Sequence, residues 1–126
     1  MFAHESLDVY RVSLEFVAWA FRLCAALPPG ERHTRDQIHR ASQSLPLNIA
    51  EGNGKPPGAD RRRFQSIALG STLECAAILD VLHARGAIDE ATVVCGKELL
   101  NRVTAMLTRL TGLADCEVSH GQDSSP

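Results

Sequence analysis

The stretch that decides the fold is residues 41–52, with the sequence ASQSLPLNIAEG. Ala41, Leu45 and Ile49 recur every fourth residue, which places them on one apolar face of a helix. Gly52 suits the residue at which such a helix ends. Pro46 removes one backbone donor from the helix interior and predicts a local kink. We therefore expect residues 41–52 to shape the contact between this helix and the next one.

Four amphipathic segments are separated by turn signals, and no stretch alternates with the period of a strand. The expected helices cover residues 6–27, 34–52, 60–85 and 89–113, with Thr34, Asp60 and Asp89 as N-caps of the last three. Short connections between helices of this length predict an all-α fold, an antiparallel up-down-up-down four-helix bundle over residues 1–114. Residues 115–126 are rich in Ser, Asp and Gly and predict a disordered C-terminal tail.

The apolar residues of each segment predict its buried face. In the first helix the main stripe is expected to be Leu7, Tyr10, Leu14, Val17, Phe21 and Cys24, with Val9, Phe16, Ala20 and Leu23 beside it. The third is expected to bury Phe64, Ile67, Ala68, Ser71, Cys75, Ile78 and Leu82, and the fourth Val93, Leu100, Val103, Leu107 and Leu110. The small pair Gly70-Ser71 is expected to allow close helix packing. The stripes are wider than one bundle core needs, which predicts self-association.

Composition argues against a strongly charged protein, a zinc protein and a membrane protein. The net charge is −2, so the whole chain is not a strong polyelectrolyte. Four cysteines occur without a C-x-x-C pair or zinc spacing, which predicts reduced thiols. No signal peptide and no apolar stretch of about 20 residues is apparent, so we expect a cytoplasmic protein without membrane contact.

The candidate polar residues favour structure over catalysis. Asn48, Glu51, Ser71 and Glu74 are expected to form a structural polar cluster where the second and third helices meet. A carboxylate pair made by Glu51 and Glu74 is the alternative, and such a pair would share a proton. No Glu-x-x-His pair, serine elbow or phosphate loop occurs. The sequence therefore predicts no catalytic residue, no metal site and no cofactor.

Basic residues concentrate in the middle of the chain. Residues 31–63 hold seven Lys/Arg against four Asp/Glu, and residues 64–126 hold four against eight. Three consecutive arginines near a helix N-terminus are disfavoured by the helix dipole and suggest a compensating anion. The candidate nucleic-acid-binding residues are Arg35, Arg40, Lys55, Arg61, Arg62 and Arg63.

Several segments together resemble a known family. They are LDVY at 7–10, QIHRA at 37–41, SLPLNIAEG at 44–52 and IALGS at 67–71. The chain resembles the small four-helix bundle proteins encoded by intervening sequences in bacterial 23S ribosomal RNA genes, for which no activity is established. The resemblance implies a homopentameric ring. A related branch, the accessory variability protein of diversity-generating retroelements, forms a basic pentameric barrel that binds nucleic acid and a reverse transcriptase.

Two functions remain open from the sequence. The first is a non-enzymatic, self-assembling bundle that binds RNA or DNA through the six basic residues. The alternative is a structural or protein-interaction scaffold, in which the arginines pair across subunits and a protein partner takes the place of nucleic acid. A net charge of −2 sets this chain apart from the basic branch.

Overall fold

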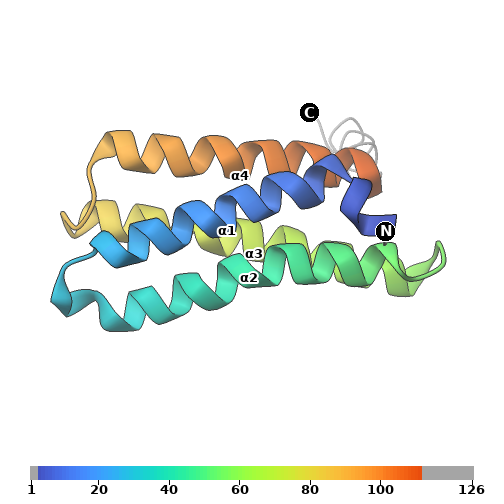
Figure 1. Ribbon diagram of the computed structural model, residues 1–126, viewed down its shortest axis with the longest axis horizontal. Coiled ribbons are helices and arrows are strands. Elements are labelled where there is room, and N and C mark those ends of the chain that lie inside the picture. The colour runs from blue at the N-terminus through green and yellow to red at the C-terminus, as the bar shows by residue number, and fades with distance from the viewer. Residues whose placement is uncertain (1–2, 112–126) are drawn as a thin grey trace, which may run out of the picture.

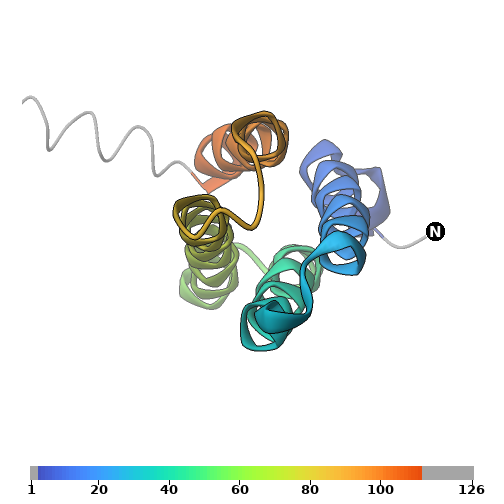
Figure 2. The same cartoon turned by 90° about the vertical axis from the view of Figure 1, so that its left-hand side faces the viewer.

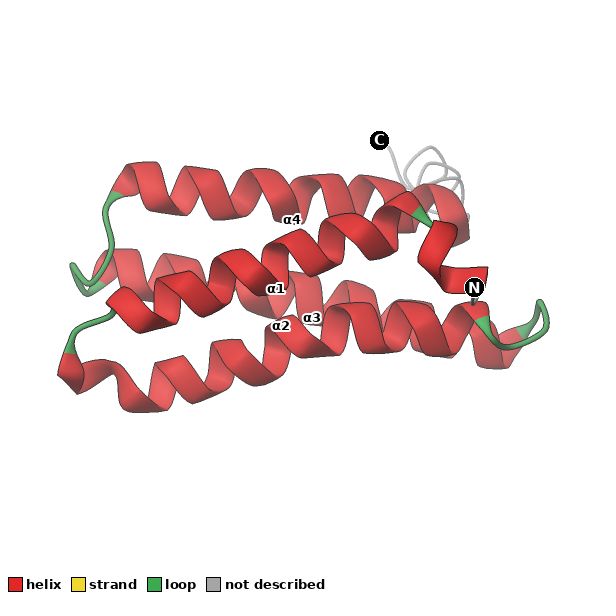
Figure 3. Ribbon diagram, in the orientation of Figure 1, coloured by secondary structure: helices red, strands yellow, loops and turns green. Residues whose placement is uncertain are grey.

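The computed structural model describes residues 3–111. A short 3₁₀ turn, η1 (Ala3–Ser6), precedes the first long helix, and a second, η2 (Pro29–Glu31), leads into the next. The four long helices are α1 (Asp8–Ala26), α2 (Arg32–Asn53), α3 (Ala59–Ala84) and α4 (Glu90–Thr111). Within the described residues the remaining segments are short loops and turns, and none is a strand (Figure 3).

The four helices form an antiparallel bundle. Each helix packs against its two neighbours, in the cyclic order α1, α2, α3, α4 and back to α1. The end-on view in Figure 2 shows this arrangement around a common core. Short connections place consecutive helices side by side in opposite directions (Figure 1). The predicted all-α four-helix bundle is confirmed. The predicted boundary at residue 114 and the tail 115–126 lie outside the described residues.

The core of α1 lies on a different face from the one predicted. Its buried residues include Val9, Phe16, Ala20 and Leu23, the stripe expected to play the secondary part, together with Val12, which neither stripe included. Cys24 of the expected main stripe is also buried. Leu14 and Phe21 of the expected main stripe are exposed. Both stripes have helical spacing, so periodicity alone did not distinguish them.

The other helices bury most of the residues predicted for them. In α2 the whole stripe is buried: Ile38, Ala41, Leu45 and Ile49. Ile67 of α3 and Leu110 of α4 were expected in the core and are exposed instead, while Phe64 is half-buried. Pro46 is buried inside α2, and the helix continues through it to Asn53.

Two of the three predicted N-caps are wrong. The second helix begins at Arg32, so Thr34 is buried in its first turn. The third begins at Ala59, directly after Gly58, whose positive φ of 150° favours glycine. Asp89 does cap α4: its Oδ1 accepts hydrogen bonds from the Thr92 backbone N–H at 2.8 Å and the Thr92 hydroxyl at 2.6 Å. These bonds, the hydroxyl first, lower the pKa of Asp89 below its ordinary value.

Close packing in the bundle depends on a glycine that the sequence did not single out. A Cβ on Gly96 of α4 would lie 2.5 Å from the Trp19 ring of α1 and 2.7 Å from Leu79 Cδ1 of α3. A Cβ on Gly70 would meet nothing within 4 Å. The expectation that Gly70 allows close packing is therefore wrong, and only its neighbour Ser71 faces α2.

The prediction that no apolar stretch is long enough to span a membrane is wrong for α3, the one helix in residues 3–111 that could do so by length and composition. Core helices of soluble bundles have the same properties. Here the inner face of α3, including Ala68, Cys75, Leu79 and Leu82, forms part of the bundle core. Burial raises the pKa of the Cys75 thiol to about 12.

Candidate functional site

A short hydrogen-bond network joins α2 to α3. The Ser71 hydroxyl of α3 donates to Ser44 Oγ of α2 at 2.7 Å. Asn48 Nδ2 donates to the same oxygen at 2.9 Å and to the Ser44 carbonyl at 2.8 Å. The Ser44 hydroxyl thus accepts two hydrogen bonds, which is its full acceptor capacity. The network fixes the register of α2 against α3 at the level of Ser44 and Ser71.

The network contains two of the four residues expected in the polar cluster. Asn48 and Ser71 meet through Ser44, which that set did not include. Glu51 and Glu74 are exposed, and neither forms an ion pair within residues 3–111. The spacing of Ser44 and Asn48, four residues apart on one helix, was the signal for their contact.

The end of α2 lies close to the start of α3. Gly52 is buried, and a Cβ there would lie 3.2 Å from Phe64 Cβ and 3.4 Å from the Arg61 carbonyl oxygen. Arg61 donates from Nε to the Lys55 carbonyl at 2.8 Å and from a terminal nitrogen to the Asn53 carbonyl at 3.2 Å. The guanidinium of Arg61 thus serves the carbonyls at the C-terminal end of α2, where the helix dipole favours a cation.

Arg35 plays the corresponding part at the opposite end of the bundle. Its Nε donates to the Cys24 carbonyl at 3.0 Å, and a terminal nitrogen donates to the Leu27 carbonyl at 3.2 Å. It therefore satisfies carbonyls at the C-terminal end of α1. At the same end, the buried carboxylate of Glu31 pairs with Arg85 at 3.1 Å.

The remaining candidate cations are more accessible. Lys55 Nζ lies 5.6 Å from the centre of the Phe64 ring, and the Arg63 guanidinium lies 5.1 Å from it. Both distances are within the range of cation–π contact. Arg62 and Arg40 are exposed, and like Arg63 they form no ion pair within the described residues. Sequence reasoning placed Phe64 in the core and missed its contact with the two cations.

The six candidate residues do not form one patch. Arg35 lies in the first turn of α2, whereas Lys55 follows the end of that helix. Twenty residues at about 1.5 Å each separate them by roughly 30 Å. Lys55 and Arg63 share the Phe64 ring where α2 connects to α3, and Arg62 is the residue before Arg63. We call these three residues the basic corner. Arg40 lies along α2 between the two ends.

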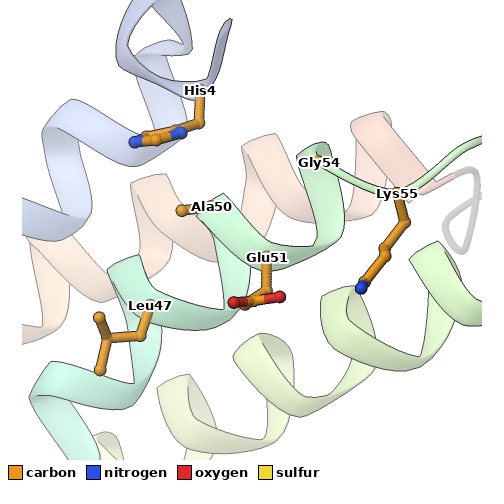
Figure 4. A pocket seen from close by; sticks show the side chains of 6 residues that line it. All are labelled: His4, Leu47, Ala50, Glu51, Gly54 and Lys55. Carbon is orange, nitrogen blue, oxygen red and sulfur yellow. The ribbon is translucent and has the colours of Figure 1, made fainter. Parts of the chain in front are cut away.

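A shallow cleft of about 320 Å³ adjoins the basic corner. Figure 4 shows the residues that line it: His4, Leu47, Ala50, Glu51, Gly54 and Lys55. The η1 turn brings His4 beside α2, a contact for which the sequence carried no signal. The cleft presents one carboxylate and one ammonium group. Among residues 3–111 no group of three or more His, Cys, Asp or Glu residues is arranged to hold a metal ion.

Comparisons with known proteins identify the family. A comparison with curated protein sequences gave no match. The model of one family, described as 23S rRNA-intervening sequence protein, matches residues 5–109 and therefore spans all four long helices apart from the last two residues of α4. The chain therefore belongs to the 23S rRNA-intervening sequence protein family.

Proposed function

We propose that the chain is a non-catalytic helical bundle that assembles with copies of itself. The observation that carries this proposal is the set of large apolar side chains left outside the core. Those that are exposed are Leu14, Phe21, Leu47, Ile67, Leu73, Val81, Val94 and Leu110. Exposed apolar side chains that group on one surface often mark a contact with another protein.

Three of these side chains are spread along the side of the bundle where α2 meets α3, with Ile67 and Val81 about 21 Å apart along α3. Ile67 and Val81 are fourteen residues apart, about four helical turns, so they lie on one flank of α3. Ser71 lies on the same flank and contacts Ser44, which places this flank beside α2. Leu47 lies one turn after Ser44 and is 64% exposed. We call Leu47, Ile67 and Val81 the α2–α3 apolar face.

A second apolar face lies on α1. Leu14 and Phe21 are seven residues apart, so they share one side of the helix. The Phe21 ring lies 5.9 Å from the His39 ring of α2, which places this side next to α2. Contact between two different faces of successive copies closes a ring when the rotation permits. The pentamer that the resemblance implies is the stoichiometry we propose.

Matched valine substitutions test the assembly. Val81 and Val94 are 48% and 50% exposed, but only Val81 belongs to the α2–α3 apolar face. In light scattering coupled to size exclusion, the full chain is expected at a multiple of 13.7 kDa. Val81→Asp is expected to reduce that mass, and Val94→Asp is expected to leave it unchanged, with both variants helical by circular dichroism. A monomeric wild-type chain, or an unchanged mass in Val81→Asp, would refute the proposal.

A second candidate function is binding of nucleic-acid phosphate at the basic corner. The exposed Arg62 and Arg63, without ion pairs in the described chain, favour it. In a ring these cations would be repeated around the axis, which would strengthen the local field. The alternative, a scaffold in which these arginines pair across subunits, uses the same side chains.

Salt-dependent binding separates these two functions. Affinity for a labelled single-stranded RNA is expected to fall with salt, and each lost phosphate contact reduces the slope by about 0.7. Arg62→Gln/Arg63→Gln should therefore lower both the affinity and the slope, whereas Arg22→Gln, an exposed arginine of α1, should change neither. Affinity no better than millimolar at low salt, or a binding curve without a salt slope, would favour the scaffold.

A further inference from the structure

The ring of Phe64 holds two cations of the basic corner close together. Its centre lies 5.6 Å from Lys55 Nζ and 5.1 Å from the Arg63 guanidinium carbon, so both cations make a cation–π contact with the same ring. The two positive charges are therefore no farther apart than these two distances combined. Within residues 3–111 no ion pair includes either of them.

The ring itself is anchored on the last turn of α2. Gly52 is buried there, and a Cβ at this position would lie 3.2 Å from Phe64 Cβ. Phe64 is half-buried near the start of α3, directly after Arg63. The glycine thus lets Phe64 pack closely against α2, and this contact fixes the base of the ring where the two helices meet.

The backbone that carries Lys55 is held as well. The Lys55 N–H donates to the Gly52 carbonyl at 3.1 Å, and the Lys55 carbonyl accepts a hydrogen bond from Arg61 Nε at 2.8 Å. Lys55 follows the end of α2, yet its backbone is bonded to both α2 and α3. Both cations therefore extend from fixed backbone positions to one fixed ring.

An anion is the ligand that such a pair of cations favours. Two like charges this close repel each other, and an anion that contacts both relieves the repulsion. A lysine or arginine side chain also loses rotamer freedom when it closes on a ligand, and this loss weakens binding. The contacts with Phe64 restrict both side chains in the free protein, so less freedom remains to be lost when the ligand binds.

We propose that Phe64 is a positioning residue for nucleic-acid phosphate at the basic corner. Its ring holds Lys55 and Arg63 ready to contact the phosphates of one strand, and both cations stay on the ring when the strand binds. The proposal rests on the second candidate function. It adds an uncharged residue to a site that was assigned from charge alone.

Phe64→Leu and Phe64→Tyr form a matched pair of variants. Leucine keeps an apolar contact with Gly52 but has no aromatic face, whereas tyrosine keeps the face that a cation needs. Loss of two exposed cation–π contacts corresponds to an affinity for the labelled single-stranded RNA that is about fivefold weaker. We expect this loss in Phe64→Leu and wild-type affinity in Phe64→Tyr, with both variants helical by circular dichroism.

The salt dependence of binding separates positioning from charge. Each phosphate contact with a single strand contributes about 0.7 to the slope, so Lys55→Gln/Arg63→Gln should lower the slope by about 1.4. Phe64→Leu retains both cations and should leave the slope unchanged. Wild-type affinity in Phe64→Leu, or a slope as low as that of the double variant, would overturn the inference alone. A wild-type chain without salt-dependent binding would refute phosphate binding and this inference with it.

Nuclear magnetic resonance of the wild-type protein supplies a readout that needs no variant. Protons above an aromatic ring are shifted upfield by its ring current, so the ε-methylene signals of Lys55 should lie upfield of their usual position. They should stay there when the RNA is bound. Signals at the usual position in the free protein, or signals that return to it when RNA binds, would overturn the proposal.

Discussion

Replacing Gly96 with alanine is expected to destabilise the protein, although alanine is the better helix former. The new methyl group would lie 2.5 Å from the Trp19 ring and 2.7 Å from Leu79 Cδ1, so at least one of these side chains must move. Leu79 is fully buried and has no free space on its core side. The substitution therefore forces a rearrangement where α1, α3 and α4 meet.

Gly70→Ala is the matched control that gives the magnitude. Both glycines lie in helix interiors, but nothing lies within 4 Å of a Cβ on Gly70. Helix propensity alone should raise the free energy of unfolding of Gly70→Ala by about 1 kcal/mol. At Gly96 the same gain is opposed by an overpacking cost of about 1–3 kcal/mol. The two variants should thus differ by about 1–3 kcal/mol, which places Gly96→Ala up to about 2 kcal/mol below the wild-type protein.

Urea denaturation followed by circular dichroism measures both free energies, at one protein concentration so that any assembly affects the variants alike. Trp19 is the only tryptophan of the chain, so its fluorescence reports the same site independently. We expect a shifted emission maximum in Gly96→Ala and none in Gly70→Ala. Equal stabilisation of both variants, with unchanged Trp19 emission, would show that the helices do not approach as closely as the structure indicates.

Two further substitutions and one alkylation experiment test other parts of the fold. Ser44→Ala removes the hydroxyl that accepts hydrogen bonds from Ser71 and Asn48, and it should lower the free energy of unfolding by about 1–3 kcal/mol. Gln43→Ala, at the neighbouring exposed position, should change the free energy of unfolding little. The folded-state pKa of Asp89 is lowered, so its contribution to stability is present above the ordinary value of 3.8 and is lost as pH falls through the folded value. The wild-type protein should therefore be more stable than Asp89→Asn, which keeps the cap without the charge, and this advantage should shrink as the pH falls below about 3.8 in acid-titrated urea melts. A constant difference would contradict this. The buried Cys75, with its pKa raised to about 12, should resist alkylation at about pH 8, while the exposed Cys95 reacts. Peptide mass mapping of the alkylated native protein measures both rates, and equal rates would contradict the burial of Cys75.

The sequence predicted the architecture well because helical periodicity and turn residues act locally. The buried stripe of α2 and the connections between helices followed from spacing alone. The inner face of α1 could not be predicted, because Leu14 and Phe21 form as regular a stripe as Phe16 and Ala20. Which stripe faces inward depends on the neighbouring helices, and the large apolar residues left outside are those on which the proposed assembly depends.

The polar contacts were predictable only in part. Ser44 and Asn48 are close in sequence, so their contact follows from helix geometry. The link from Ser44 to Ser71 spans twenty-seven residues and depends on the register between α2 and α3. The contact of His4 with the cleft depends on how η1 folds back, which periodicity does not describe.

The arginines at the start of α3 illustrate why charge along a sequence does not give the charge available to a ligand. A run of cations at a helix N-terminus suggested an external anion. The carbonyls that end α2 lie at the same place and accept both hydrogen bonds from Arg61. Arg35 likewise serves the end of α1. Two of the six candidate cations are thus committed to helix ends, and the field that a phosphate would meet where α2 connects to α3 comes from Lys55, Arg62 and Arg63.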